Sequence, residues 1–137
     1  TTLKLKKFLD SLNSRGVRVN YDPANLVMVT GDDPVQGVFN LKEYIVHTHA
    51  KDGIMIKRDN PSRIYKSFAD KNPEGLNYRD FFREVPLGEG HVNFSKYLKA
   101  LEDIGYKGFL TVEREVGENP EQDIRKAVEF LRKLTDG

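Results

Sequence analysis

The sequence predicts an α/β fold, a partial (β/α)8 TIM barrel with about three parallel strands and four helices. Helical and strand-like segments alternate along the chain, which is typical of parallel strands joined by right-handed helical crossovers. Three strand-like runs also end in residues that can bind a divalent metal, and barrel enzymes carry their functional groups at these strand ends. The three residues are Asp22, His49 and Glu113.

The chain opens with an amphipathic helix. Apolar residues from Leu5 to Leu12 follow helical spacing, a threonine at either of the first two positions can cap the helix, and Gly16 is expected to close it. Residues 17–22 then form a strand-like run of β-branched and aromatic side chains.

Capping signals mark the next helix. Asp33, Pro34 and Gln36 are typical of an N-cap, a first-turn proline and a capping-box partner. The helix is therefore expected to run to about Leu41. Residues 44–49 form the second strand-like run.

The last part of the chain repeats this pattern. Asn93 can cap a helix, and Gly105 is expected to end it. The third strand-like run covers residues 109–113, and Asn119 with Pro120 marks the start of the last helix. The apolar face of that helix consists of Ile124, Ala127, Val128, Leu131 and Leu134.

Residues 53–86 are the least regular stretch, too long for an ordinary connection within a compact domain. Basic and aromatic residues in it would suit a lid over a ligand, a subunit contact or a nucleic-acid surface. Acidic residues interrupt the basic ones, which argues against a continuous groove for phosphates. We therefore expect an insertion that serves as a lid or an interface. Its aromatic residues are Tyr65, Phe68, Tyr78, Phe81 and Phe82.

The composition argues against several classes of function. Lys and Arg number 22 against 21 Asp and Glu, so almost no net charge favours binding to nucleic acid or to an anionic membrane. No apolar run approaches the ~20 residues of a membrane helix. The lack of cysteine excludes disulfides and thiolate ligands and fits a cytoplasmic location. The chain starts at Thr1 within helical periodicity, so we expect a cut there.

His47 and His49 provide the strongest local signal. Side chains alternate along a strand, so both imidazoles should point to one face, with Lys51 just beyond in the loop. Imidazole is a common metal ligand, but ordinary surface or core histidines fit this pair equally well. Taken alone, Asp22 before a proline favours a turn, and Glu113 in a charged run favours a solvated side chain. The combination of all three strand ends is what favours a shared metal site.

Four motifs occur in order at residues 19–26, 45–53, 84–94 and 105–115: VNYDPANL, IVHTHAKDG, EVPLGEGHVNF and GYKGFLTVERE. Together they resemble the xylose isomerase-like TIM-barrel superfamily of sugar and sugar-phosphate isomerases and epimerases, which is related to the endonuclease IV fold. The resemblance implies that residues 1–137 are the C-terminal half of such a barrel, with strands 6 to 8 and the helix before strand 6. The amino-terminal half would then be absent.

In the resembled family a divalent metal, which could be Mn, Mg, Co or Zn, sits among two glutamates, an aspartate and a histidine. The resemblance assigns three of these ligands to Asp22, His49 and Glu113, and Glu113 would also be a catalytic acid/base. The remaining glutamate would precede Thr1, so we expect little or no turnover from the isolated chain. The implied substrate contacts are His47, Lys51, Asn25 and Glu84.

The resemblance favours an isomerase or epimerase that transfers a proton through a metal-stabilised enediolate of a sugar or sugar phosphate. A missing half-barrel or a second copy of the chain would complete the site. A keto-inositol dehydratase on the same scaffold, or a non-catalytic half-barrel that assembles with a partner, remains an alternative. An endonuclease IV-type zinc phosphodiesterase fits less well, because Asn25 stands where its motif would supply a histidine.

Overall fold

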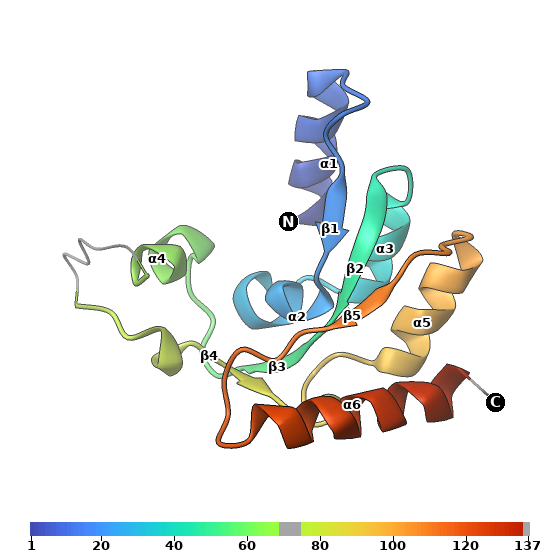
Figure 1. Ribbon diagram of the computed structural model, residues 1–137. Helices are drawn as coiled ribbons and strands as arrows, with labels where there is room; N and C mark the ends of the chain where they lie inside the picture. Colours follow the sequence, from blue (N-terminus) through green and yellow to red (C-terminus); the bar gives the residue numbers. More distant parts are fainter. Residues whose placement is uncertain (69–74, 136–137) are drawn as a thin grey trace.

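A computed structural model describes residues 1–68 and 75–135. Its centre is a parallel sheet of three strands, β1 (Val19–Tyr21), β2 (Ile45–Ala50) and β5 (Leu110–Val112), in the order β1-β2-β5 (Figure 1). Each strand falls on one of the three predicted runs. The α/β class and the parallel arrangement predicted from the sequence are confirmed.

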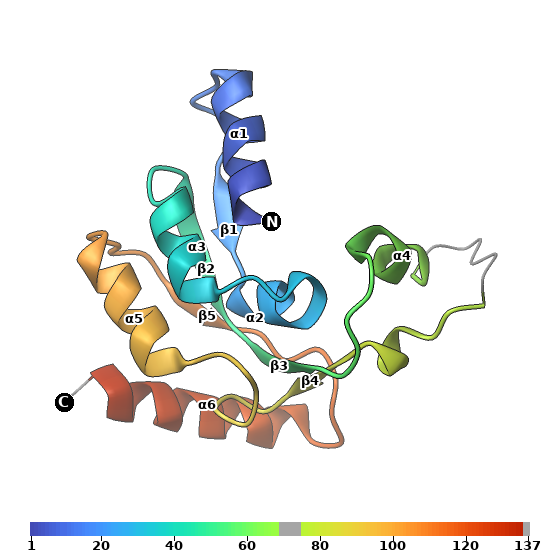
Figure 2. The same ribbon diagram turned by 180° about the vertical axis from the view of Figure 1, so that it is seen from behind.

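Three helices lie side by side against this sheet: α1 (Thr2–Leu12), α3 (Pro34–Leu41) and α5 (Phe94–Asp103). Figures 1 and 2 show α3 and α5 on one face of the sheet, with α1 beside the first strand. The last helix, α6 (Pro120–Thr135), follows β5 and packs near it. Within the described residues, no helix combines the length and the apolar character needed to cross a membrane.

The predicted N-caps Thr1, Asp33, Asn93 and Asn119 all accept hydrogen bonds from the helices that follow them, and one predicted helix end is wrong. Asp33 accepts hydrogen bonds from the backbone N–H groups of the first turn of α3, and Asn93 does the same for α5. Helix α1 does not run on to Gly16. It ends at Leu12, because Asn13 takes a left-handed conformation with φ 44° and closes the helix.

The segment expected to be irregular carries regular structure. Strand β3 (Asp52–Met55) pairs antiparallel with β4 (Phe82–Val85), and α4 (Pro61–Lys66) and a 3-10 turn, η2 (Tyr78–Asp80), lie between them. The described part of residues 53–86 is therefore more regular than expected. Residues 69–74 lie outside the described residues, and the role as a lid or an interface stays a prediction. Figure 1 shows the connection through α4 reaching away from the parallel sheet.

A short helical segment after β1 was not predicted either. Helix α2 (Pro23–Asn25) continues directly into a π-helical turn, η1 (Leu26–Thr30), which ends at Gly31 with φ 67°. Met28 and Val29 of this turn are buried, and the turn packs against β3 and β4. The segment therefore joins the parallel sheet to the β3–β4 pair.

The core lies between the sheet and its helices, but part of the apolar surface stays outside it. In α1, Leu9 is buried, whereas Leu5, Phe8 and Leu12 of the predicted stripe are exposed. Helix α1 packs mainly on α3, which covers only part of the apolar stripe of α1. In a full barrel, further neighbours would cover the rest of that stripe.

Candidate metal centre

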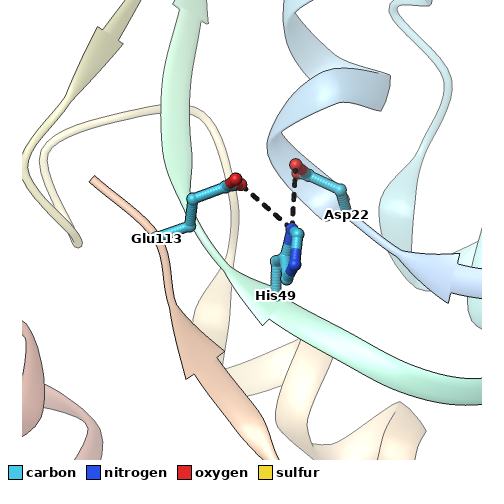
Figure 3. Close-up of side chains that lie close together, drawn as sticks. All are labelled: Asp22, His49 and Glu113. Atoms are coloured by element: carbon cyan, nitrogen blue, oxygen red, sulfur yellow. Dashed lines mark ion pairs between the residues drawn. The ribbon is translucent and has the colours of Figure 1, made fainter. Parts of the chain in front are cut away.

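Three side chains from three strand ends meet at one point (Figure 3). Asp22 follows β1, His49 lies in β2 and Glu113 follows β5. The Nδ1 atom of His49 is 3.0 Å from Oε2 of Glu113 and 3.6 Å from Oδ2 of Asp22. One potential ligand atom from each residue lies within 4.8 Å of the others. We call these three residues the triad. The parallel register places the three strand ends at the same edge of the sheet, which brings the triad together.

The imidazole of His49 is oriented toward the centre of the triad. Its Nδ1 atom is buried and forms no hydrogen bond with any described residue, although two carboxylates flank it. Its Nε2 atom lies 3.1 Å from the side-chain amide of Asn20. The nearer amide atom is Nδ2 of Asn20, which donates to Nε2 when the ring proton is on Nδ1. Binding of a cation by Nδ1 requires the other tautomer, in which Nε2–H donates to the amide oxygen after the amide group turns over. An imidazole nitrogen with two carboxylates is a donor set that a divalent cation accepts.

Asp22 is fixed by the short helix that follows it. Its Oδ1 atom accepts hydrogen bonds from the backbone N–H groups of Ala24, at 2.8 Å, and Asn25, at 3.1 Å. Its Oδ2 atom accepts a hydrogen bond of 2.8 Å from Nδ2 of Asn25 and faces His49. Burial raises the pKa of Asp22, and the hydrogen bond from the Asn25 backbone opposes that rise. The α2 cap therefore holds one candidate ligand in place without a metal.

Lys51 sits beside the triad with its ammonium group almost completely buried. Its Nζ atom is 3.2 Å from Oε2 of Glu113 and also pairs with Glu115. Burial lowers the pKa of this ammonium group, but the hydrogen bond to Glu115 and the neighbouring carboxylates outweigh burial and raise the pKa overall. Lys51 therefore stays charged and counters part of the negative charge of the triad.

Glu84 connects Lys51 to the segment after β5. Its side chain is 7% exposed, and its carboxylate pairs with Lys51 at 3.4 Å and with Arg114 at 2.8 Å. Arg114 also pairs with Asp123 at the start of α6. The Oε1 atom of Glu84 accepts a hydrogen bond of 3.0 Å from the backbone of Glu115. The predicted substrate contact thus occupies a buried position in β4, where charged partners already engage its carboxylate.

The other predicted substrate contacts lie around the triad. The ring of His47 meets that of His49 edge to face, with centroids 6.0 Å apart, and its Nε2 atom lies 2.8 Å from Oγ1 of Thr111. The two imidazoles share the sheet face that the strand period predicted. Asn25 is exposed at the end of α2 and contacts Asp22, as described above. All the proposed site residues are therefore grouped at one end of the sheet.

A family model for the xylose isomerase-like TIM barrel matches residues 1–134. The chain belongs to the xylose isomerase-like TIM barrel family. The fold agrees with this assignment: a xylose isomerase domain protein from Planctomyces limnophilus has a similar structure, with a TM-score of 0.73 and 29% identity. That similarity covers 97% of this chain and 43% of the other chain.

Two curated members of the family are also similar in sequence. An inosose dehydratase from Clostridium perfringens is 28% identical over 99% of this chain, and one from Lacticaseibacillus casei is 26% identical over 96%. The matched regions are 44% and 42% of those proteins. The chain therefore spans less than half the length of the curated relatives that it matches.

One buried residue of this xylose isomerase-like chain was not singled out from the sequence. Asp52 is 1% exposed, and its carboxylate accepts hydrogen bonds from the backbone N–H groups of Gly53, Gly88, Gly90 and Val92. Burial raises the pKa of Asp52, and these hydrogen bonds oppose the rise. Asp52 is the first residue of β3, so these hydrogen bonds hold the LGEG motif (residues 87–90) against that strand. The two glycines of that motif were an indirect sequence signal of this contact, because glycine lets the backbone approach a neighbouring group closely.

Proposed function

We propose that the chain carries the metal-binding part of an enzyme that removes a proton next to the carbonyl of a polyhydroxylated small molecule. The observation that supports this most directly is the buried Nδ1 atom of His49, which lies between two carboxylates and forms no hydrogen bond with any residue that the structure describes. Asp22, His49 and Glu113 would hold the cation. When bound, a divalent cation polarises substrate oxygens and lowers the barrier to proton removal from the neighbouring carbon.

Glu113 is the proposed base, because its carboxylate lies at the edge of the triad and is about one third exposed. It takes the proton from the carbon next to the carbonyl. Lys51 pairs with that carboxylate at 3.2 Å and gives the site a charged donor for a substrate oxygen. His47 and Asn25 supply further polar contacts to hydroxyl groups.

We favour dehydration of a keto-inositol over isomerisation. Two of the curated relatives are named inosose dehydratases, although they share only 26–28% identity with this chain. Elimination of water needs a base and a donor for the departing hydroxyl, and Glu113 and Lys51 are 3.2 Å apart at the site. A sugar isomerase or epimerase is the second candidate. It needs a second carboxylate acid/base, which the resemblance places outside residues 1–137.

We further propose that other strands complete the barrel, from the same protein or from a second copy. Among the described residues, β1 and β5 each pair with β2 alone, so each has a free edge. Free edges of a parallel sheet are normally covered. A non-catalytic half-barrel that assembles with a partner is compatible with the same edges, and only an activity assay separates the two.

The test uses the full-length protein with Mn²⁺ and an inosose. Proton NMR would follow loss of the substrate and the appearance of the dehydrated product. Glu113→Gln should reduce turnover at least 100-fold, because a positioned general base typically contributes about 10²–10⁴-fold. If the product is an isomer with the same mass, the second candidate function replaces the first. Absence of both metal binding and turnover would refute the proposal.

A further inference from the structure

A cavity of about 910 Å³ lies next to the triad and extends along the segment between β3 and β4. Two of the lining residues contact the triad directly: Asn25 donates to Asp22, and Lys51 pairs with Glu113. A ligand held at the triad can therefore continue into the cavity. Pockets that hold drug-sized ligands measure about 300–1,000 Å³, so this one is larger than a single sugar ring requires.

Four aromatic side chains line the cavity: Tyr65, Phe68 and Tyr78 from the segment between β3 and β4, and Phe82 from β4 itself. The last three form a cluster. The ring centroids of Phe68 and Tyr78 are 4.8 Å apart and nearly parallel, and Phe82 lies 5.6 Å from Tyr78. Yet Phe68 is 54% exposed and Tyr65 is 57% exposed. Large exposed apolar surface within a hollow is typical of a binding site.

We infer that this cavity binds an aryl substituent on the polyhydroxylated ring, so that the substrate class is an aryl-bearing carbonyl polyol rather than a free one. The inference rests on the proposed function, which places the polyol ring at the triad. The aryl group stacks on the cluster of Phe68, Tyr78 and Phe82. This cluster lies in the segment that sequence analysis assigned as a lid or an interface.

The lining favours an aryl group over a second sugar. The lining also includes Met28, Val29 and Ile56, whose side chains offer no hydrogen bonds to hydroxyl groups. A second sugar would lose hydrogen bonds to water there without replacing them, whereas an aromatic ring gains stacking contacts.

Three arginines also line the cavity. Arg114 is engaged by Glu84 and Asp123, whereas Arg79 and Arg83 are exposed to solvent. The guanidinium of Arg79 lies over the Tyr78 ring, 5.7 Å from its centroid, so it extends the planar stack. Arg83 belongs to β4. Neither exposed arginine changes the preference for a flat ring, because guanidinium groups also stack on aromatic faces.

The test compares phenyl β-D-glucopyranoside with methyl β-D-glucopyranoside on the full-length protein with Mn²⁺. Neither compound has a free carbonyl, so binding is measured by NMR titration without turnover. We expect the phenyl compound to bind about tenfold more tightly, the scale of a favourable aromatic stack. Equal affinities would overturn the inference. Tighter binding of cellobiose than of the phenyl compound would also overturn it, by assigning the cavity to a second sugar.

A matched pair of variants tests whether the preference for the phenyl compound arises at the aromatic cluster. Phe68→Ala should reduce the preference for the phenyl compound to less than about threefold, because it removes one stacking face. Phe39→Ala changes a residue of α3 that is 40% exposed and does not line the cavity, so the preference should stay. An unchanged preference in Phe68→Ala would overturn the inference. Calorimetric titration with Mn²⁺ alone tests the triad: metal binding without a phenyl preference refutes only this inference, and absence of metal binding refutes the proposed function.

Discussion

Replacement of Glu84 by glutamine should destabilise the fold, although the side chain keeps its shape. Glu84 is the shared partner of Lys51 and Arg114, and all three side chains are less than 10% exposed. Removing one partner of a buried ion pair typically costs about 3–5 kcal/mol. Lys51 keeps its two other carboxylates and Arg114 keeps Asp123, so we expect the lower end, about 3 kcal/mol.

The assay is thermal unfolding of wild type and Glu84→Gln by circular dichroism. In a chain of this length about 1 kcal/mol shifts Tm by roughly 3–5 °C, so Tm should fall by about 10 °C. Glutamine can still accept the backbone hydrogen bond from Glu115, which restricts the change to the loss of charge.

Glu121→Gln is the matched control. Glu121 also pairs with an arginine at 2.8 Å, but both side chains are at least 74% exposed. Its loss should cost no more than about 0.5 kcal/mol. If Glu84→Gln destabilises the chain no more than this control, burial does not increase the contribution of the Glu84 ion pairs to stability.

The remaining predictions concern the supports of the site. Gly90→Ala should destabilise the fold by about 2 kcal/mol or more in urea unfolding, because a Cβ atom there overlaps the Asp52 carboxylate. Gly16→Ala should change little, because a Cβ atom there would make only an ordinary contact with the Ser14 hydroxyl. Asp52→Asn should destabilise by about 2–5 kcal/mol, since its amide group would face backbone donors; a smaller value would contradict the assigned role. Asn25→Ala should weaken Mn²⁺ binding about tenfold in calorimetry, while Asn60→Ala, the cap of α4, should leave it unchanged.

The parts of the fold that were predicted correctly depend on local patterns. The cap residues Asp33 and Asn93 act on the turn that follows them, so a few neighbouring residues define each helix start. The ends of parallel strands share one edge, so the strand-end residues Asp22, His49 and Glu113 could be placed together from their positions alone. Local periodicity and the rule for parallel sheets were sufficient for both results.

The parts that were missed depend on contacts between distant residues. In the β3–β4 pair, Met55 is opposite Phe82 and Asp52 is opposite Val85, and no short-range turn signal marks a pairing over such separations. The network of ion pairs likewise joins distant parts of the chain: Glu84 lies within β4, Lys51 follows β2 and Arg114 lies beyond β5. From the sequence alone, charged residues in such positions are expected to be exposed to solvent, because only the tertiary structure brings them together.

The two oxygens of Asp22 have different partners, and this restricts which residues can replace it. Oδ1 caps α2, while Oδ2 faces the imidazole of His49. Serine or asparagine could keep the cap but would remove a carboxylate from the triad. Glutamate could keep the carboxylate, but its extra methylene would displace it from the backbone N–H groups of α2. Aspartate therefore meets both the requirement of the α2 cap and that of the proposed metal site.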